Sequence, residues 1–396
     1  MNVMKSELKT KAAVLSVALL LYTSSMTTPA IGAIAKAFPD VSPELIKQVA
    51  ALPPLMTIVG ALLTGQLEQF MKKKTILYFA IAIEFLFGGI IPAVYGDMTF
   101  ILVCRAIFGL GYGLIFPLAS SLVADLFEGQ ERDAMMGLKS AIGAAAGIVF
   151  QMIGGYLAVI SWRYAFWGFL LLIPIFIVIA LVLPEPARKP KPSAANGFSN
   201  GRLTRRTWYL SILNLLYNIV LFSFMTNVAI VMAEGKIGNA AQAGVVLTAF
   251  TSGAFATGLL YGKIAQIFRE YTAALAVGLV GLAFLILVHV HTYPLFVIAG
   301  IVFGLGFGIY NPALTLLVVG SAHQSAATLA VSIYIALQGV GQFLSPIVLA
   351  FVTKILGFHG PKAAWLVAGP TLIVTCAVII LVTALLKLKS KTVTNS

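Results

Sequence analysis

The sequence predicts an all-α membrane protein in which twelve transmembrane helices form two pseudo-symmetric six-helix bundles. Three observations indicate this: the composition, the spacing of apolar runs, and an internal repeat. Of 396 residues, 60% are hydrophobic and 10% are charged, whereas about 25% are charged in a soluble domain. Mean hydropathy is +1.00. A chain this apolar cannot hide its side chains from water, so lipid must be its solvent. A soluble domain, a disordered chain and a coiled coil are excluded.

Twelve apolar runs are long enough to cross a membrane as helices, for which about 20 residues are needed. The breaks between them carry turn or charge signals, such as Phe38-Pro39-Asp40. The first run is too long for the core of a cleavable signal peptide, so we expect it to be a span. The runs begin near Lys11, Val49, Thr75, Phe100, Leu138, Tyr164, Trp208, Ala241, Tyr271, Pro294, Leu329 and Ala364.

The segment 184–207 separates the sixth run from the seventh. It contains four prolines, six basic residues and a Ser/Asn/Gly stretch. Such a composition cannot form a packed core, so the segment is predicted to be a linker. The expected organisation is an N-terminal bundle over 1–183, a cytoplasmic linker over 184–207, and a C-terminal bundle over 208–396.

Basic residues predict the orientation in the membrane. The chain has 26 Lys and Arg against 13 Asp and Glu, a net charge of +13. With a cytoplasmic N-terminus, nineteen basic residues fall on cytoplasmic segments and six on outer ones. This bias follows the positive-inside rule. We therefore expect a multi-pass protein of the cell inner (cytoplasmic) membrane with both termini cytoplasmic, and no nucleic-acid partner.

An internal repeat relates the two halves of the chain. The ten residues from Phe108 to Pro117 read almost letter for letter as those from Phe303 to Pro312, at an offset of 195. Leu20-Leu21-Tyr22 matches Leu215-Leu216-Tyr217 at the same offset, and further matches join the second run to the eighth and the fifth to the eleventh. Parallel six-helix halves enclose a site near the bilayer midplane and can rock about it. This pattern predicts a secondary transporter.

Other classes of protein lack support in the sequence. The four histidines form no ligand cluster, the two cysteines have no metal spacing, and there is no nucleotide-binding loop. We expect no enzyme activity, no cofactor and no metal site. The expected partners are a small-molecule substrate, protons or another coupling ion, and the lipid bilayer, with the protein a monomer.

The loop after the second run contains Gly65, Leu67 and a basic pair. These residues resemble the cytoplasmic loop motif of the major facilitator superfamily, in which Gln69 replaces the usual Asp and Lys72 the second Gly. The resemblance to this family covers essentially the whole chain. In that family this loop latches the inward gate. Lys72 to Lys74 either pair with Asp125 as a latch or anchor the chain as inside-facing charges. The resemblance implies a cytoplasmic gate of Gly65, Gln69, Lys73, Asp125 and Arg132.

Arg105, followed by Gly109 and Gly111, resembles the family's fourth-helix motif. It is the only basic residue inside a span. It either extends outward to the membrane surface or faces the cavity in substrate contact or proton relay. Glycines near 143–155 resemble part of the fifth-helix antiporter motif, but Phe150-Gln151 stands where Gly-Pro is usual. The whole pattern resembles the twelve-helix drug efflux branch.

Glu84 is the only acidic residue deep in a span, about 14 Å from the inner surface. An isolated carboxylate there is costly, so burial favours the protonated form. Glu84 and Arg105 are therefore candidates for proton coupling. The alternative for Glu84 is a neutral, hydrogen-bonded structural acid.

In the family, the first, fourth, seventh and tenth helices line the cavity with help from others. Aromatic, Met and amide side chains on these helices suit an amphipathic ligand that forms a few hydrogen bonds. Each polar group can equally join helices to one another. The predicted substrate-binding residues are Tyr22, Met26, Arg105, Gln151, Tyr217, Asn218, Tyr310, Asn311 and Gln338.

The sequence thus predicts a secondary active transporter that moves a small amphipathic organic molecule by alternating access, with proton-coupled efflux as the leading mode. The alternative is uptake or exchange of a small organic anion that Arg105 would bind.

Overall fold

The structure is a computed structural model that describes residues 2–186, 203–323 and 326–394, and its regular elements there are all helical. The chain divides into two compact units. The first unit comprises Met1–Gly197, Val228–Val245 and Gln342–Pro346, and the second comprises Phe198–Asn227, Val246–Gly341 and Ile347–Ser396. Of the linker predicted over 184–207, residues 187–202 lie outside the described part of the chain.

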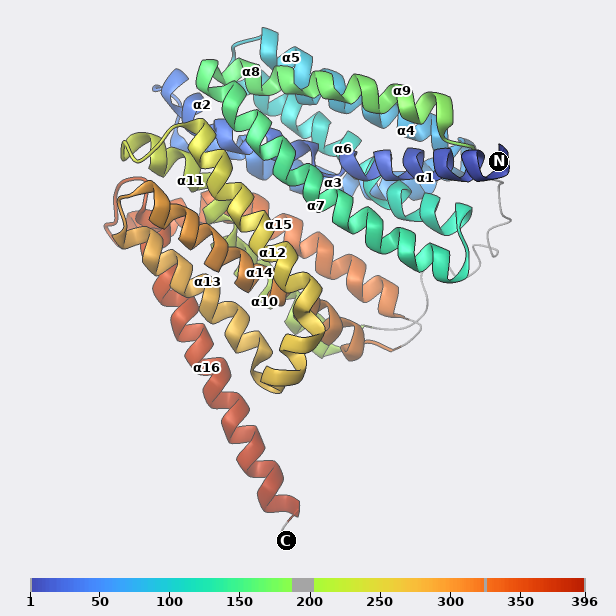
Figure 1. Ribbon diagram of the computed structural model, residues 1–396. Coiled ribbons are helices and arrows are strands. Elements are labelled where there is room, and N and C mark those ends of the chain that lie inside the picture. The colour runs from blue at the N-terminus through green and yellow to red at the C-terminus, as the bar shows by residue number, and fades with distance from the viewer. Residues whose placement is uncertain (1, 187–202, 324–325, 395–396) are drawn as a thin grey trace. The chain divides into compact units, whose positions relative to one another are not determined.

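Helices before residue 187 all belong to the first unit (Figure 1). In chain order they are α1 (Asn2–Leu20), η1 (Thr23–Met26), η2 (Thr28–Ala30), α2 (Ile31–Ala37), α3 (Pro43–Phe70), α4 (Lys73–Ile83), η3 (Glu84–Ile90), α5 (Ile91–Val94), α6 (Met98–Leu126), α7 (Gly129–Ile160), α8 (Trp162–Trp167), η4 (Gly168–Leu171) and α9 (Leu172–Val182).

Helices after residue 202 follow in the same figure. They are α10 (Arg205–Leu221), α11 (Ser223–Glu234), α12 (Ala240–Phe268), η6 (Arg269–Tyr271), α13 (Thr272–His289), α14 (Tyr293–Ser321), α15 (Ala327–Ile355) and α16 (Ala363–Thr394).

Membrane spans can be counted by helix length and apolar composition. Among the described residues, ten helical stretches qualify, or eleven if the bent pair Leu8–Leu20 and Thr23–Ala37 is one span. One stretch, Ala240–His289, has 50 residues and contains both α12 and α13. A helix of that length measures roughly 75 Å, more than twice the thickness of the hydrocarbon layer. The number twelve remains a prediction.

The first span is broken in its middle. α1 ends at Leu20, two short 3₁₀ segments follow, and the two parts meet at 49°. The sequence explains the break, because the segment from Thr23 to Thr28 contains five hydroxyl residues and Pro29 follows it. Ser and Thr hydroxyls bond to nearby backbone groups in competition with the helix, and proline lacks the N–H that the helix needs.

A π-helical segment interrupts the third span. It is η3, which begins at Glu84 and contains Gly88 and Gly89. The rings of Phe108 and Phe169 lie where side chains on these glycines would stand. π-helical turns are rare and frequently lie at functional sites.

The sequence repeat reappears in helix packing within each unit. In the first unit, a Cβ atom added at Gly109 or Gly113 of α6 would lie within 3.0 Å of the Pro53 or Thr57 carbonyl oxygen of α3. In the second unit, Gly304 and Gly308 of α14 have the same relation to Phe250 and Ala254 of α12. Helices in lipid gain little from the hydrophobic effect, so such close backbone approach holds them together.

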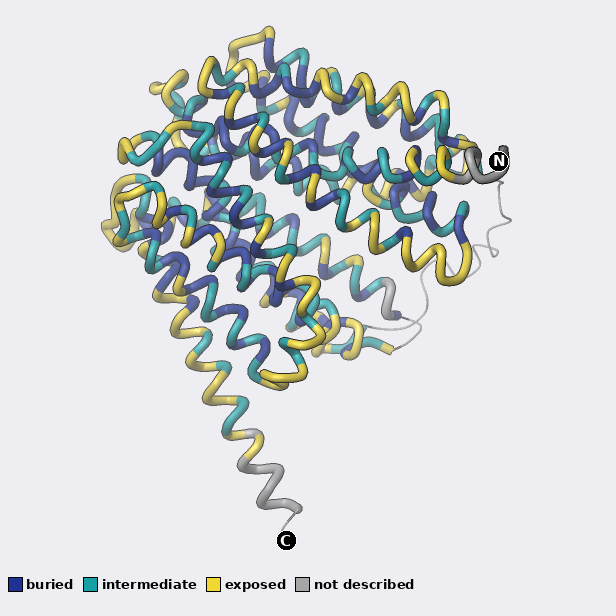
Figure 2. Tube along the Cα trace, in the orientation of Figure 1, coloured by how far each residue is buried: buried dark blue, intermediate teal, exposed yellow. Residues whose placement is uncertain are grey.

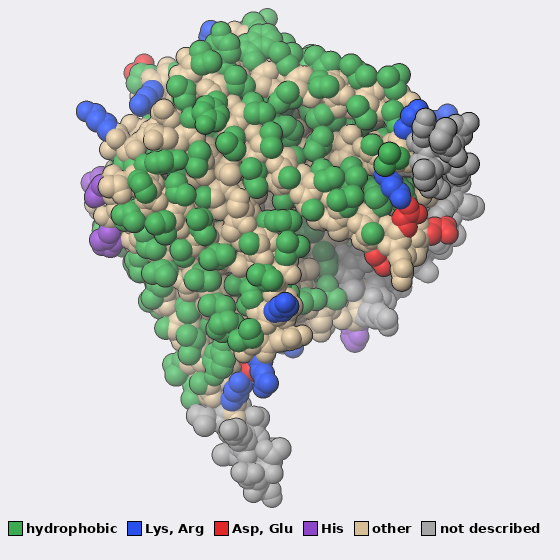
Figure 3. Space-filling view, in the orientation of Figure 1, with side chains coloured by type: hydrophobic (Ala, Val, Ile, Leu, Met, Phe, Trp, Pro, Cys, Tyr) green, Lys and Arg blue, Asp and Glu red, His purple; other side chains and the backbone are tan. Residues whose placement is uncertain are grey.

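Large buried aromatic side chains fill the second unit. Phe224 and Phe303 stack with their ring centroids 4.4 Å apart, and Phe250 and Phe284 meet Phe303 edge-on. Fully buried Trp365 donates from its indole Nε1 to the Ser223 carbonyl at 3.2 Å. Buried and exposed positions alternate along the helices (Figure 2). Hydrophobic side chains dominate the exposed face in Figure 3, as a lipid environment requires.

Candidate functional site

Among the described residues of the first unit, two charged side chains are fully buried, Glu84 at the start of η3 and Arg105 in the second turn of α6. Both have an exposed fraction of 0%. They are the residues that the sequence singled out as the charges well inside the spans. Buried charges of this kind require hydrogen-bond partners or opposite charges.

Arg105 is held by several groups of the first unit. Its Nε donates to the Val49 carbonyl of α3 at 2.8 Å, and its Nη2 donates to the Ser24 hydroxyl at 3.2 Å. The guanidinium carbon lies 4.4 Å from the centre of the Phe108 ring, which is a cation–π contact. The Arg105 side chain is therefore enclosed by groups of the first unit, with an exposed fraction of 0%.

Glu84 accepts one hydrogen bond, from the Thr23 hydroxyl to its Oε2 atom at 3.0 Å. Glu84 and Arg105 are close enough to interact electrostatically. No ion pair shorter than 4.0 Å joins them in the part of the chain that the structure describes. Glu84 Oε1 and Arg105 Nη1 are buried and have no hydrogen-bond partner among the described residues. The arrangement is a buried carboxyl near a guanidinium that its neighbours hold in place.

The break in the first span supplies partners to both charges. Thr23 binds Glu84, and the next residue, Ser24, binds Arg105. The Tyr112 hydroxyl of α6 donates to the Leu21 carbonyl beside the break. Sequence reasoning did not pair Thr23 and Ser24 with the charges. The run of hydroxyl residues was the available signal, because Ser and Thr side chains both interrupt a helix and supply hydrogen-bond donors and acceptors.

Three other predicted residues lie in the first unit. The Tyr22 ring packs on the glycine face of α7, where side chains on Gly143 and Gly147 would stand. Met26 is buried, with its sulfur against Gly168. Gln151 is a buried residue of α7. The glycines that resemble the antiporter motif thus form the surface on which Tyr22 lies.

A second cluster lies in the second unit, on α10, α14 and α15. The Tyr217 and Tyr310 rings stack with centroids 3.8 Å apart. Tyr310 donates to Asn214 Oδ1 at 3.1 Å, and Asn218 Nδ2 donates to the same oxygen at 2.9 Å. The Tyr217 hydroxyl is buried without a partner among the described residues. Three predicted residues, Tyr217, Asn218 and Tyr310, are thereby brought together.

Asn214 was missed by sequence reasoning although it is the centre of this cluster. Besides its two side-chain bonds, it donates to the Tyr334 carbonyl at 3.3 Å. Its position one turn before Asn218 was the available signal. Asn311 donates to the Phe307 carbonyl of its own helix at 3.4 Å, and Gln338 is half-buried on α15. Neither is linked to the cluster by a side-chain bond of the structure.

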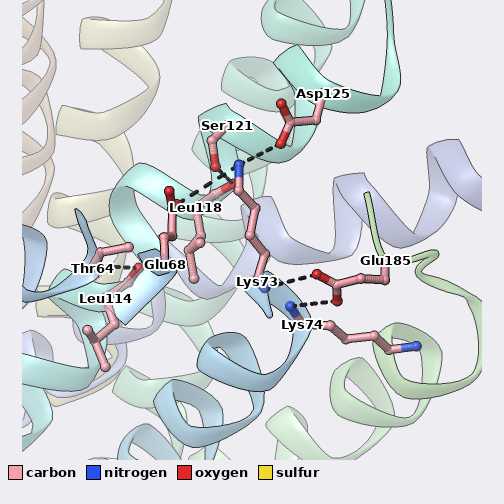
Figure 4. A network of polar contacts seen from close by, with 9 residues as sticks. All are labelled: Thr64, Glu68, Lys73, Lys74, Leu114, Leu118, Ser121, Asp125 and Glu185. Carbon is pink, nitrogen blue, oxygen red and sulfur yellow. Dashed lines mark hydrogen bonds and ion pairs between the residues drawn. The ribbon is translucent and has the colours of Figure 1, made fainter. Parts of the chain in front are cut away.

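A polar network joins the ends of α3, α4, α6 and α9 (Figure 4). Lys73 Nζ contacts Asp125 Oδ2 at 2.5 Å and Glu68 Oε1 at 3.9 Å. The side chains of Lys73 and Asp125 are 19% and 22% exposed. The predicted pairing of the lysine run with Asp125 is thus present, made by Lys73. A half-buried pair of this kind fastens the start of α4 to the end of α6.

Glu185 adds a second connection, which sequence reasoning missed. Its carboxylate accepts hydrogen bonds from the backbone N–H groups of Lys73 at 3.0 Å and Lys74 at 3.1 Å. These are the first residues of α4, where N–H groups have no partner within the helix and favour a negative charge. The Lys74 ammonium reaches back to the carbonyls of Ala180 and Leu183. Hydrogen bonds therefore connect the start of α4 to Glu185 and to the carbonyls at the end of α9.

The remaining predicted gate residues lie outside these bonds. A Cβ added at Gly65 would meet nothing within 4 Å. Arg132 is exposed in the first turn of α7. Gln69 lies near the end of α3 and interacts with a further group. The contacts therefore centre on Lys73, Asp125 and Glu185.

Comparison with known proteins gives a family match over nearly the whole chain. The sequence model of the Major Facilitator Superfamily matches residues 13–235 and 210–395. The chain is 25% identical over 283 residues to "Multidrug resistance protein 1" of Bacillus subtilis, a match that covers 67% of this chain and 70% of that protein. The chain thus resembles the drug efflux branch.

Other relatives match over shorter stretches. The "MFS-type efflux pump MMF1" of Pseudozyma antarctica is 30% identical over 210 residues, which cover 50% of this chain and 36% of that protein. The match thus spans about a third of the length of that relative.

Solved structures share the fold. A mutant of the nucleoside transporter NupG aligns with a TM-score of 0.76 at 14% identity, covering 93% of this chain and 98% of that one. A bacterial homolog of the human lysosomal transporter Spinster aligns with a TM-score of 0.68 at 14% identity, covering 94% and 95%.

Proposed function

The chain belongs to the Major Facilitator Superfamily, and from this membership we propose that it is a secondary transporter that exports a small amphipathic organic molecule in exchange for protons. The proposed coupling rests on the buried Glu84 carboxyl near Arg105. Glu84 accepts a hydrogen bond from Thr23 of the broken first span, and Arg105 donates one to the next residue, Ser24. A nucleotide-binding loop is missing from the sequence, so we assign the driving force to an ion gradient.

The proposed architecture follows the sequence repeat. Twelve spans form two six-helix bundles over 1–183 and 208–396, joined by a cytoplasmic linker over 184–207. The protein is a monomer in the cytoplasmic membrane with both termini inside. Assigning α12 and α13 to separate spans, and the two parts of the broken helix to one span, gives this number.

Glu84 is the proposed proton site. A carboxylate removed from water is costly unless a cation or hydrogen bonds offset the loss of hydration. Arg105 and Thr23 provide these for the ionised form, and protonation removes the need for them. The free energy difference between protonated and ionised Glu84 therefore depends on where Arg105 and Thr23 lie relative to its carboxyl. Alternating access that changes this arrangement would release or take up a proton.

The proposed substrate contacts are the aromatic and amide residues predicted from sequence. Tyr22 offers a ring held on the glycine face of α7, and Tyr217 stacks on Tyr310 beside Asn218. Aromatic faces with few polar groups suit planar, amphipathic compounds. Arg105, Met26, Gln151, Asn311 and Gln338 complete the proposed set.

Lys73 and Asp125 are the proposed cytoplasmic latch, with Glu185 as a second fastening of the same helix end. Gly65, Gln69 and Arg132 stay in the proposal on the family resemblance alone. Neutralising Asp125 should weaken the attachment of α4 and favour opening at this end.

Everted membrane vesicles test the proposal. A pH gradient is set up, and its dissipation is followed when a lipophilic cation such as ethidium is added. Export coupled to protons predicts dissipation by the wild type and none by Glu84→Gln. Asp40→Asn removes an exposed carboxyl and serves as the matched control, with dissipation retained. Unchanged dissipation in Glu84→Gln would rule out Glu84 as the proton site.

One observation favours a second candidate function, the exchange of a small organic anion. Arg105 Nη1 is a buried donor without a partner among the described residues, and a carboxylate is its natural acceptor. Counterflow of a radiolabelled monocarboxylate in proteoliposomes, without pH change, would support this function over export. Loss of the counterflow in Arg105→Lys would assign it to the guanidinium.

A further inference from the structure

We infer that Thr23 is a positioning residue that transmits the protonation state of Glu84 to the end of α1. The inference rests on the proposed role of Glu84 as the proton site. It adds the physical link between that site and the broken span that carries Tyr22.

The Thr23 hydroxyl lies between two acceptors. Its Oγ1 is 3.0 Å from Glu84 Oε2 and 3.1 Å from the Leu20 carbonyl oxygen. A hydroxyl carries one proton and donates one hydrogen bond, while its oxygen can also accept. Thr23 is buried, with an exposed fraction of 1%, so water does not replace a missing partner easily. The Thr23 hydroxyl can therefore donate to only one of the two acceptors at a time.

The protonation state of Glu84 determines which of the two acceptors receives the hydrogen bond from the Thr23 hydroxyl. An ionised carboxylate is the stronger acceptor, so the Thr23 O–H donates to Glu84 and the Leu20 carbonyl loses this bond. A protonated Glu84 instead donates from Oε2 to Thr23 Oγ1, and the Thr23 O–H rotates to donate to Leu20. Thr23 keeps its own proton throughout, and the proton on Glu84 comes from solution. Two hydrogen bonds reverse or form, and no covalent bond to Thr23 changes.

Leu20 is the last residue of α1, where carbonyl groups lack partners within the helix. The next two carbonyls are also bound by hydroxyls, that of Leu21 by Tyr112 and that of Tyr22 by Ser25. Of these three hydroxyls, the one of Thr23 alone bonds to a carboxyl. The Leu20 carbonyl thus receives the Thr23 hydrogen bond when Glu84 is protonated and loses it when Glu84 is ionised.

Other titratable groups face Glu84 from α6. Arg105 and Tyr112 are close enough to interact with it electrostatically. Arg105 favours the ionised carboxyl, and its bond to Ser24 holds the residue after Thr23. Tyr22 precedes Thr23, and its ring packs on Gly143 and Gly147. A change at the end of α1 therefore acts next to a proposed substrate contact.

Infrared difference spectroscopy of the full-length protein in lipid nanodiscs tests the inference. Spectra recorded at acidic and alkaline pH show the C=O band of any carboxyl that becomes protonated, together with backbone amide changes. We expect one band that is absent in Glu84→Gln. In Thr23→Val this band should move to higher frequency, because the carboxyl loses its acceptor. The amide change that accompanies protonation should be lost as well.

Two variants serve as controls. Thr23→Ser keeps the hydroxyl and should restore both signals. Thr27→Val removes another buried hydroxyl of the same segment, which donates to the Ser24 carbonyl and not to a carboxyl, and should leave both signals as in the wild type. If Thr23→Val fails to fold, Thr23→Ala provides the same loss of the hydroxyl in a smaller side chain.

The inference is overturned if the Glu84 band and the amide change persist unshifted in Thr23→Val, or if acidification produces no band that depends on Glu84. These outcomes are independent of transport. Loss of the signals in Thr23→Val together with normal proton-coupled export by Glu84→Gln would overturn the proposed function and leave the hydrogen-bond link standing. Coupled export that needs Glu84, with signals unaffected by Thr23→Val, would overturn the link alone.

Discussion

Arg105 and Gly300 occupy equivalent positions in the two halves of the sequence, and each lies against the equivalent carbonyl group. Arg105 Nε donates to the Val49 carbonyl at 2.8 Å. A Cβ added at Gly300 would lie 2.8 Å from the Val246 carbonyl oxygen. The offsets are 195 and 197 residues, the same as elsewhere in the repeat. One half therefore has a side chain bonded to this carbonyl where the other has close backbone contact. Among the described residues, a buried basic side chain is found in the first half alone.

Removing Arg105 should leave the Glu84 carboxyl without its counter-charge. We expect Arg105→Ala to lower the free energy of unfolding by about 1–3 kcal/mol, because buried acceptors such as the Val49 carbonyl lose their charged donor. The double variant Arg105→Ala/Glu84→Gln should lose less than the sum of the two single changes. Unfolding by sodium dodecyl sulfate, followed by circular dichroism, measures the four free energies. Strict additivity would show that the two groups are not coupled.

The packing of α14 on α12 should be sensitive to a single methyl group. A Cβ at Gly304 would overlap the Phe250 carbonyl and a nearby backbone nitrogen, neither of which is the end of a flexible side chain. Gly304→Ala should therefore lower the free energy of unfolding by about 1–3 kcal/mol. A Cβ added at Gly258 of α12 would meet nothing within 4 Å. Gly258→Ala should therefore be neutral or stabilise the protein by up to about 1 kcal/mol, because alanine favours the helix. Thermal unfolding of the two variants gives the comparison, and equal losses would argue against the close approach.

Glu185 should stabilise α4 as a capping residue supplied by a distant segment. Glu185→Ala removes the acceptor of the first two N–H groups of the helix and should cost about 1 kcal/mol. Glu128 is the matched control, because it also precedes a helix but its side chain forms no capping bond. Glu128→Ala should change the midpoint of thermal unfolding much less. Raising the salt concentration should narrow the difference, because both carboxylates are exposed.

The ion pair between Glu270 and Lys387 of α16 should contribute to stability in a way that depends on pH. The Glu270 carboxylate lies 2.7 Å from Lys387 Nζ, and the hydrogen bond from Lys387 lowers the pKa of Glu270 below its ordinary value. A lowered pKa in the folded protein means that this pair stabilises the fold above the ordinary pKa of glutamate. The contribution is lost as pH falls through the lowered pKa. Lys387→Met should return the pKa of Glu270 towards its ordinary value in a carbon-13 NMR titration of labelled glutamate, whereas Lys354→Met should leave it unchanged.

The sequence by itself determined the class of fold, the repeat and the positions of the rare charges. Hydropathy is a property of consecutive residues, so the helices α3, α6, α7 and α14 lie where apolar runs were found. The repeat offset also holds for the glycine contacts of α6 and α14. The Lys73–Asp125 pair was predictable because the family resemblance places both residues at the same end of neighbouring helices.

The tertiary structure alone decided which polar groups meet. Successive residues point about 100° apart around a helix, so a partner depends on how two helices are rotated and how closely they approach. Hydropathy carries neither quantity. Thr23 meets Glu84 because the first span breaks at Leu20, Asn214 joins Tyr310 because α10 and α14 face each other there, and Glu185 caps α4 from more than a hundred residues away. In lipid such bonds replace those that water would offer, so these few contacts set the chemistry that the apolar sequence leaves open.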